Sequence, residues 1–304
     1  MRVAVTGASG FVGGAIATAL ADDGHRVVGY GRRAGGWSHP SATYRVWDLA
    51  RGPLREPDRV DAVVHAAGLT DVWAGFERAL LANRDGTRSV VRTFPNKRIV
   101  HVSTSAVYDD AGPSVHVAED ARLPERHLSP YGATKALAEG ELSGRDVAIL
   151  RPHLVYGPGE RAMVRGLLAA VRGGRLLLPA GGEVPHALTH IDNLVAAVRS
   201  AVIPFGPKGV FNVTDAAPVL LSDAIGELLE RRGVEARIVG VPTPAAFRAA
   251  HAVERAARIA RTRPPLTRFM VNRLGYERTY NLTAAREQLT YRPRATSFDG
   301  AEAW

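Results

Sequence analysis

The chain of 304 residues has no cysteine, few lysines and no long apolar run. The absence of cysteine excludes disulfide bonds and thiolate chemistry, and it leaves a cytoplasmic location as the default. A membrane-spanning helix needs about 20 successive apolar residues, so no integral membrane segment is expected. The N-terminal residues 1–20 are apolar enough for a signal peptide, but their glycines fall at fixed positions and no cleavable small-residue site follows.

Positive charge comes almost entirely from arginine. Lys and Arg number 39 against 30 Asp and Glu, giving a net charge of +9, yet only three of the 39 are lysines. A nucleic-acid surface would gather these residues into a basic tract interleaved with aromatics, whereas here they are spread along the chain. The composition therefore predicts no nucleic-acid partner and favours a small ligand that carries phosphate.

Short β-branched segments alternate with amphipathic stretches through the first half of the chain. The expected strands are 2–6, 25–30, 44–47, 62–65, 99–103, 147–150 and 209–213. The expected helices are 11–22, 161–172, 222–232 and 244–260, with another starting near Asp192. This alternation predicts an α/β fold, a Rossmann-type doubly wound parallel sheet covered by helices on both faces.

A glycine-rich segment, TGASGFVG, follows the first expected strand and opens the first helix. Gly7 permits a tight turn, Gly10 lets the backbone approach a pyrophosphate, and Gly13 allows close packing of helix on strand. With Phe11 and Val12, these residues predict a dinucleotide-binding loop at a helix N-terminus. Residues 1–155 and 188–215 are expected to form the dinucleotide-binding domain, and residues 156–187 and 216–304 a smaller C-terminal substrate-binding lobe.

The second expected strand ends without a carboxylate. An NAD-binding unit usually has Asp or Glu there for the ribose hydroxyls, but this chain has Gly31 followed by Arg32 and Arg33. Two guanidiniums suit a 2′-phosphate, which Arg binds in a bidentate way. NADP(H) is therefore the preferred cofactor, with NAD(H) possible.

Tyr131 and Lys135 are four residues apart, so on a helix they share one face. An ammonium in that position lowers the pKa of a neighbouring phenol, which then exchanges a proton with an alcohol or ketone.

Together these motifs resemble the extended short-chain dehydrogenase/reductases, an NAD-dependent epimerase/dehydratase-like group, nearly from end to end. The resemblance rests on TGASGFVG, Asp48-Leu49, HAAG at 65–68, NRDGT at 83–87, VSTSAVY at 102–108, YGATK at 131–135, RPHLVYGPG at 151–159 and HIDNL at 190–194. It implies that Tyr131 and Lys135 are catalytic and that Thr104, four positions before Tyr108, completes the site. Ser103 and Ser105 flank Thr104, so an offset of one position stays open.

The resemblance also implies the residues that contact the cofactor, and it implies a homodimer. Asp48 and Leu49 are expected at the adenine. The others are expected to line the rest of the cofactor: Ala66, Ala67, Gly68, Asn83, Ser103, Pro152, His153 and Val155. His190 and Asp192 have the pattern of a strand end and a helix N-cap, so no metal site is expected. His116 and His127 are expected in a loop that crosses the substrate cleft.

Three reactions compete within such a family. A dehydratase needs acidic residues after the catalytic threonine, but Ser105 and Ala106 stand there. An epimerase usually has an arginine shortly before the HIDNL-like motif for the substrate diphosphate, where this chain has His186. Residues 266–293 are similar to the C-terminal lobe of the hydroxysteroid and sterol dehydrogenase-like branch. The preferred hypothesis is an NADP(H)-dependent ketoreductase with a sugar-like or alicyclic substrate, using Tyr131, Lys135 and Thr104. A nucleotide-sugar epimerase with bound NAD and a catalytically silent dinucleotide-sensing protein remain alternatives.

Overall fold

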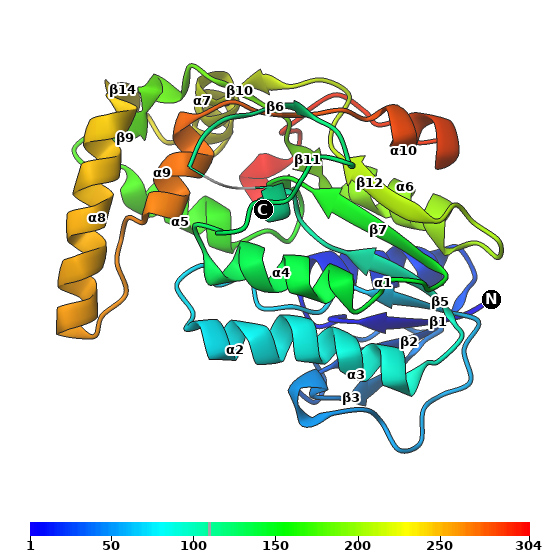
Figure 1. The fold of residues 1–304 in the computed structure, drawn as a ribbon. Coiled ribbons are helices and arrows are strands. Elements are labelled where there is room, and N and C mark those ends of the chain that lie inside the picture. The colour runs from blue at the N-terminus through cyan, green and yellow to red at the C-terminus, as the bar shows by residue number, and fades with distance from the viewer. Residues whose placement is uncertain (109–110) are drawn as a thin grey trace.

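The central element of the fold is a parallel sheet of seven strands, seen here in a computed structural model that describes residues 1–108 and 111–304 (Figure 1). The spatial order is β12-β7-β5-β4-β1-β2-β3. Its strands are β1 (Arg2–Thr6), β2 (Arg26–Gly31), β3 (Thr43–Val46), β4 (Ala62–His65), β5 (Arg98–Val102), β7 (Val147–Pro152) and β12 (Gly209–Val213). The predicted α/β doubly wound fold is confirmed, with strand ends shifted slightly from those expected.

The apolar residues of these strands alternate between two cores, because successive side chains point to opposite faces of a sheet. On β1, Val3 and Val5 join one buried cluster and Ala4 joins the other. Since both faces are buried, the strands read as nearly continuous apolar runs rather than as alternating ones. The few polar residues in them therefore stand out.

Helices cover both faces. One face carries α1 (Phe11–Asp22), α6 (Ile191–Val202) and α10 (Thr283–Gln288). The other carries α2 (Phe76–Leu80), α3 (Gly86–Thr93) and α4 (Pro130–Gly140), which lie in front of the sheet in Figure 1. A π-helical turn, η2 (Leu81–Asp85), joins α2 to α3. Sequence analysis did not predict the helical run from α2 to α3.

The order of the strands reverses between β1 and β4. The chain moves outward from β1 to β3 on one side, and then from β4 through β5 and β7 to β12 on the other. In open α/β sheets, ligands bind at the carboxyl ends of the strands next to such a reversal. Almost all of the predicted site residues follow strand ends at this edge.

The C-terminal lobe consists of smaller sheets and four helices. Its four-stranded sheet has the order β13-β10-β15-β6, and β9 pairs with β14 and β8 with β11. The strands are β6 (Ser114–Val117), β8 (Val155–Tyr156), β9 (Arg175–Pro179), β10 (Pro185–His186), β11 (Thr189–His190), β13 (Val219–Leu220), β14 (Arg237–Val241) and β15 (Arg278–Tyr280). The helices are α5 (Ala162–Ala170), α7 (Leu221–Arg231), α8 (Thr243–Ala260) and α9 (Arg268–Gly275), with the short 3-10 turns η4 (Ala180–Gly182) and η5 (Ala301–Ala303). Two further 3-10 turns, η1 (Leu49–Arg51) and η3 (Ser105–Tyr108), follow β3 and β5 of the main sheet.

Candidate active site

The glycine-rich loop follows β1 at the reversal of strand order. Gly7 has φ of 77°, a left-handed backbone that favours glycine, and a Cβ there would lie 2.8 Å from the Cα of Ala67. A Cβ on Gly13 would overlap the carbonyl oxygen of Gly7, so α1 packs directly on the loop. The cap of α1 is Gly10, which has no side chain to bind the first N–H groups of the helix. Those groups and the helix dipole fit a pyrophosphate.

Phe11 and Val12 lie in the first turn of α1 and are half-buried. A Cβ on Gly159 would lie 3.4 Å from the ring of Phe11. This contact joins the glycine-rich loop to the segment that follows β7.

Asn83 holds the loop after β4, which contains Ala66, Ala67 and Gly68. It is buried in the π-helical turn η2, a deviation that is common at functional sites. Its Oδ1 accepts a hydrogen bond from the Leu69 N–H at 2.7 Å, and its Nδ2 donates to the Leu69 carbonyl at 3.2 Å and to Thr134 Oγ1 at 2.9 Å. The side-chain amide is thus engaged in tying the loop to α4.

Arg32 and Arg33 follow the carboxyl end of β2 and are exposed. Tyr44 donates from its hydroxyl to the Arg33 carbonyl at 2.8 Å. A Cβ on Gly31 would lie 2.7 Å from Ser9 Oγ, so this arginine-bearing segment lies against the glycine-rich loop. Neither guanidinium forms an ion pair with a carboxylate of residues 1–108 or 111–304.

Asp48 and Leu49 follow β3. The Asp48 carboxylate accepts a hydrogen bond from the Ala50 N–H at 3.2 Å and begins η1, while its side chain stays 35% exposed. Leu49 instead packs into the core, 3.4 Å from where a Cβ on Gly86 would lie. Of the two, only Asp48 keeps its side chain partly exposed.

Three hydroxyls follow β5, and they differ in what they bind. Ser103 donates to the buried Glu139 carboxylate at 2.5 Å, and Ser105 Oγ lies 2.8 Å from His153 Nδ1. Thr104 Oγ1 accepts from the Ala106 N–H at 3.2 Å. No acceptor in the described part of the chain engages the proton of Thr104, so this hydroxyl can donate to a substrate oxygen.

Tyr131 and Lys135 lie on α4, whose start is set by local sequence. The hydroxyl of Ser129 accepts from the Gly132 N–H at 3.2 Å, and Pro130 occupies the first helical position. Tyr131 is half-buried, whereas Lys135 is 4% exposed and its ammonium donates to the Val102 carbonyl at 2.8 Å. Burial lowers the pKa of Lys135 to about 8, although Glu139 acts in the opposite direction. Lys135 therefore stays charged at neutral pH.

Two buried histidines lie beneath Lys135. His101 Nε2 is 3.1 Å from the lysine Nζ, and its ring centroid is 5.0 Å from that of His65. Burial, with the Lys135 charge, lowers the pKa of His65 to about 3 and that of His101 well below its usual value. Both rings are therefore neutral. Sequence analysis missed His101, whose only signal was a polar residue in an apolar strand.

The segment after β7 turns toward the C-terminal lobe. His153 is fully buried, and its Nδ1 lies 2.9 Å from Arg273 Nη2 and 3.2 Å from the Tyr280 hydroxyl. Pro152 ends β7, and Val155 begins β8. The contacts of His153 join the sheet edge to α9 and β15, a juxtaposition of residues more than 100 positions apart that no sequence motif indicated.

The remaining histidine predictions need two corrections. His190 ends β11 as expected, but the N-cap of α6 is His190 itself, whose ring accepts from the Asp192 N–H at 3.2 Å. His116 lies in β6 rather than in a loop, because that segment pairs with β15. His127 lies in a loop, with Nε2 3.0 Å from the Val107 carbonyl.

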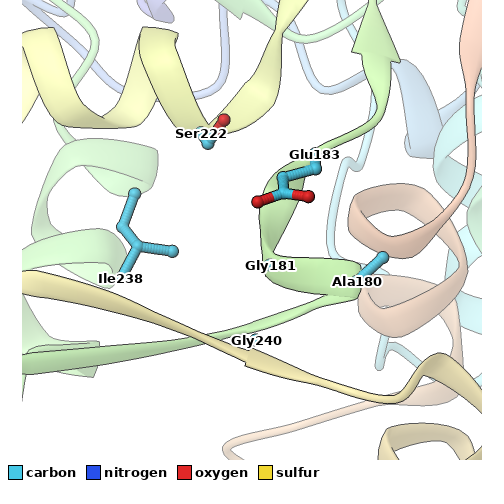
Figure 2. Close-up of a pocket in the computed structure, with 6 residues that line it drawn as sticks. All are labelled: Ala180, Gly181, Glu183, Ser222, Ile238 and Gly240. Atoms are coloured by element: carbon cyan, nitrogen blue, oxygen red, sulfur yellow. The ribbon is translucent and has the colours of Figure 1, made fainter.

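A cavity of about 280 Å³ lies apart from these residues, between η4, β14 and the start of α7 (Figure 2). Its lining is Ala180, Gly181, Glu183, Ser222, Ile238 and Gly240. None of these belongs to the predicted site. No helix of residues 1–108 and 111–304 has the length and apolar character to cross a bilayer, and no cluster of acidic, histidine or cysteine side chains there suits a metal ion.

Comparisons with known proteins identify the family of the chain. The model of the NAD-dependent epimerase/dehydratase family matches residues 3–213. The chain is 33% identical to a 4-hydroxy-2-methyl-3-oxo-4-farnesyl-3,4-dihydroquinoline-1-oxide ketoreductase of Stigmatella aurantiaca, over 100% of this chain and 95% of that protein. It is 29% identical to a 2-alkyl-3-oxoalkanoate reductase of Stenotrophomonas maltophilia, over 99% of this chain and 97% of that protein.

Solved structures share the fold. A UDP-glucuronic acid 4-epimerase from Bacillus cereus in complex with NAD superimposes with a TM-score of 0.72 at 21% identity, over 100% of this chain and 94% of that one. A UDP-glucose 4-epimerase from Thermotoga maritima gives 0.74 at 18% identity, over 99% and 96%. At these identities the likeness concerns the fold alone.

Proposed function

Because the chain belongs to the NAD-dependent epimerase/dehydratase family and is an NAD(P)-dependent oxidoreductase of the extended short-chain dehydrogenase/reductase type, we propose that it is an NADP(H)-dependent ketoreductase. It interconverts a ketone, alicyclic or sugar-like, and a secondary alcohol. The observation that carries the proposal is that two proteins named as ketone reductases match the chain from end to end, C-terminal lobe included. That lobe, 156–187 with 216–304, is proposed to bind the substrate.

The chain's own groups suffice for the proton chemistry. NADPH, when bound, supplies the hydride. The Thr104 hydroxyl, whose proton is uncommitted, donates to the ketone oxygen and stabilises the charge that develops there. The Tyr131 phenol gives its proton to that oxygen as the carbonyl becomes an alcohol. The Lys135 ammonium makes the phenol a stronger acid, and it would also bind the nicotinamide ribose.

We propose that the cofactor lies along the carboxyl edge of the sheet. The N-terminus of α1 and Gly7, Gly10, Phe11, Val12 and Gly13 would hold the pyrophosphate, Asp48 the adenine, and Ala66, Ala67, Gly68, Pro152 and Val155 the remainder. Leu49 and His153 have buried side chains, so they would contribute only their backbone. Ser103 and Asn83 have their side chains engaged within the protein, so we assign them to supporting the loops rather than to direct side-chain contact.

NADP(H) is proposed over NAD(H) because of Arg32 and Arg33. Both residues are exposed and have no carboxylate partner in the described residues, and Gly31 before them lies against Ser9 of the glycine-rich loop. A carboxylate at the end of β2 would repel a 2′-phosphate. Position 31 has no room for an acidic side chain, because a Cβ on Gly31 would lie 2.7 Å from Ser9 Oγ.

Epimerisation is the alternative reaction within the family, and the environment of His186 argues against it. This side chain stands near the position where an epimerase has its diphosphate arginine, but it is fully buried and lies 2.7 Å from the Arg273 carbonyl through Nε2. Burial lowers the pKa of His186, so the ring carries no positive charge for a diphosphate.

The exposed apolar side chains of α2, η2 and α4 support a homodimer. Phe76, Leu81 and Leu137 are 45%, 46% and 45% exposed on neighbouring helices, and a second copy would bury them. We propose that two chains associate through these helices.

The purified protein distinguishes the candidate functions. We expect no cofactor to remain bound after purification, and NADPH to be oxidised with decalone, an alicyclic ketone, giving an alcohol detected by mass spectrometry. Tightly retained NAD with conversion of UDP-glucose to its epimer would refute the reductase. NADPH binding without turnover of any ketone, unchanged in Tyr131→Phe, would leave a dinucleotide-sensing protein.

A further inference from the structure

Three polar side chains cross the sheet in register beneath α4. Thr6 of β1 pairs with His65 of β4, and His65 pairs with His101 of β5. All three lie near the carboxyl ends of their strands and are at most 1% exposed. We call this set the polar row. Its first member contacts the loop after β4, since Thr6 Oγ1 also accepts from the Ala67 N–H at 3.3 Å. Its last member, His101, contacts Lys135.

Hydrogen bonds around the polar row fix the tautomer of His65. Thr87 donates its only hydroxyl proton to the Asn83 carbonyl at 2.7 Å, so at 2.9 Å it must accept from His65 Nε2. His65 Nδ1 then accepts from Thr6 Oγ1 at 2.7 Å. A neutral imidazole has one donor and one acceptor, and both are satisfied here. His65 has no capacity left for Lys135 or His101.

His101 carries its proton on the opposite nitrogen. An ammonium only donates, so His101 Nε2, 3.1 Å from Lys135 Nζ, must be the acceptor and Nδ1 must carry the hydrogen. That Nδ1 is buried and has no hydrogen-bond partner among the described residues. A buried donor without a partner lowers the free energy of unfolding, and an apolar residue in β5 would avoid this loss. Compared with an apolar residue, the His101 imidazole supplies one further group, the hydrogen-bond acceptor Nε2.

Within residues 1–108 and 111–304, His101 is the only side chain that accepts a hydrogen bond from Lys135. From α4, Glu139 raises the lysine pKa through space, but its carboxylate hydrogen-bonds Arg151 and Ser103. From β4, His65 is neutral and fully engaged. From β5, the Val102 carbonyl is the second acceptor. Two of the three ammonium protons are therefore fixed inside the protein.

We propose that His101 is a positioning residue, which uses the Nε2 lone pair to hold the Lys135 ammonium charged and to direct its third N–H out of the core. This inference rests on the proposed function, in which that ammonium acts on Tyr131 and the cofactor ribose. A neutral ring suits this task, because a cationic one would repel the ammonium. The deep burial of His101 and the neighbouring Lys135 charge keep the ring neutral.

The pH dependence of reduction tests the proposal. The ammonium is lost as pH rises through the pKa of Lys135, about 8, so wild-type activity with NADPH and decalone should fall on the alkaline side. His101→Phe removes the acceptor but keeps a ring, and we expect the alkaline limb to move down by about one pH unit. His101→Gln restores an acceptor oxygen and should return the limb toward wild type. Equal losses of kcat at every pH in both variants, with no movement of the limb, would refute the proposal.

A measurement on the free protein is independent of catalysis. In ¹⁵N-histidine NMR, His101 should be protonated at Nδ1, and its Nε2 resonance should change near the lysine pKa of about 8. That change should vanish in Lys135→Met. An Nε2-protonated ring, or a resonance that titrates identically in Lys135→Met, would refute the proposal. If no ketone is reduced, the proposed function fails while this spectrum still decides the role of His101.

Discussion

The two ends of the sheet edge differ in how their polar groups are held. At the end where we propose that the reaction takes place, called here the reacting end, Thr104 and Lys135 are buried and hydrogen-bonded to backbone groups. At the outer end, Arg32 and Arg33 are exposed and form no ion pair with the described carboxylates. Electrostatic interactions are strong where water is excluded and weak where it is not. Changes at the reacting end should therefore alter the chemistry, and changes at the outer end only the affinity for one cofactor.

The strongest test of this difference is Tyr131→Phe. Removing the proton donor should lower kcat for ketone reduction by about 10² to 10⁴-fold, while NADPH binding, measured by fluorescence titration, stays within about twofold of wild type. Tyr30→Phe is the matched control, since it removes a hydroxyl that donates to Asp58 at 2.7 Å in another part of the sheet. Full activity in Tyr131→Phe would remove this residue from the mechanism.

The reacting end was also the part that sequence could predict only in outline. Tyr131, Lys135 and Thr104 were predicted because each belongs to a short motif after a strand or at a helix start. The acceptors of Lys135 were not, because His101 gains its role only when β5 is placed beneath α4. The same applies to Arg273 and Tyr280, which reach His153 from the C-terminal lobe. Short motifs mark the residues that follow strand ends. Contacts between distant segments leave no local pattern in the sequence.

The predicted strands illustrate the same distinction for the fold. The seven strands of the main sheet were all found, because buried parallel strands form short β-branched runs. The strands β6, β9, β10, β13, β14 and β15 were missed. Three of them, β10, β13 and β15, have only two or three residues, too few to show a strand pattern. The helical run from α2 to α3 was missed as well, and it contains the π-helical turn that positions Asn83.

A second test concerns stability beneath the reacting end. Glu139 and Arg151 form a doubly hydrogen-bonded pair with side chains only 8% and 5% exposed. Glu139→Gln leaves the arginine charge buried without a counter-ion, and we expect the free energy of unfolding to fall by about 3 to 5 kcal/mol in urea denaturation. Glu141→Gln, two residues later, breaks an ion pair with Arg88 that is more exposed and should cost less than about 1 kcal/mol. Similar losses in both variants would show that burial does not distinguish them.

The smallest effect is expected at the outer end. In the double variant Arg32→Ala and Arg33→Ala, two hydrogen-bonding cations are lost from an exposed site, where water and salt weaken each interaction. We therefore expect NADPH affinity to fall only about tenfold, equivalent to about 1.4 kcal/mol, with NADH affinity and kcat unchanged. The loss should shrink at high salt, because the interaction is with a phosphate charge. Arg26→Ala, at the other end of β2 and also exposed, controls for the general loss of positive charge. If the affinities for NADH and NADPH fall equally, the arginines do not bind the 2′-phosphate, and the outer end contributes only a general attraction for the dinucleotide.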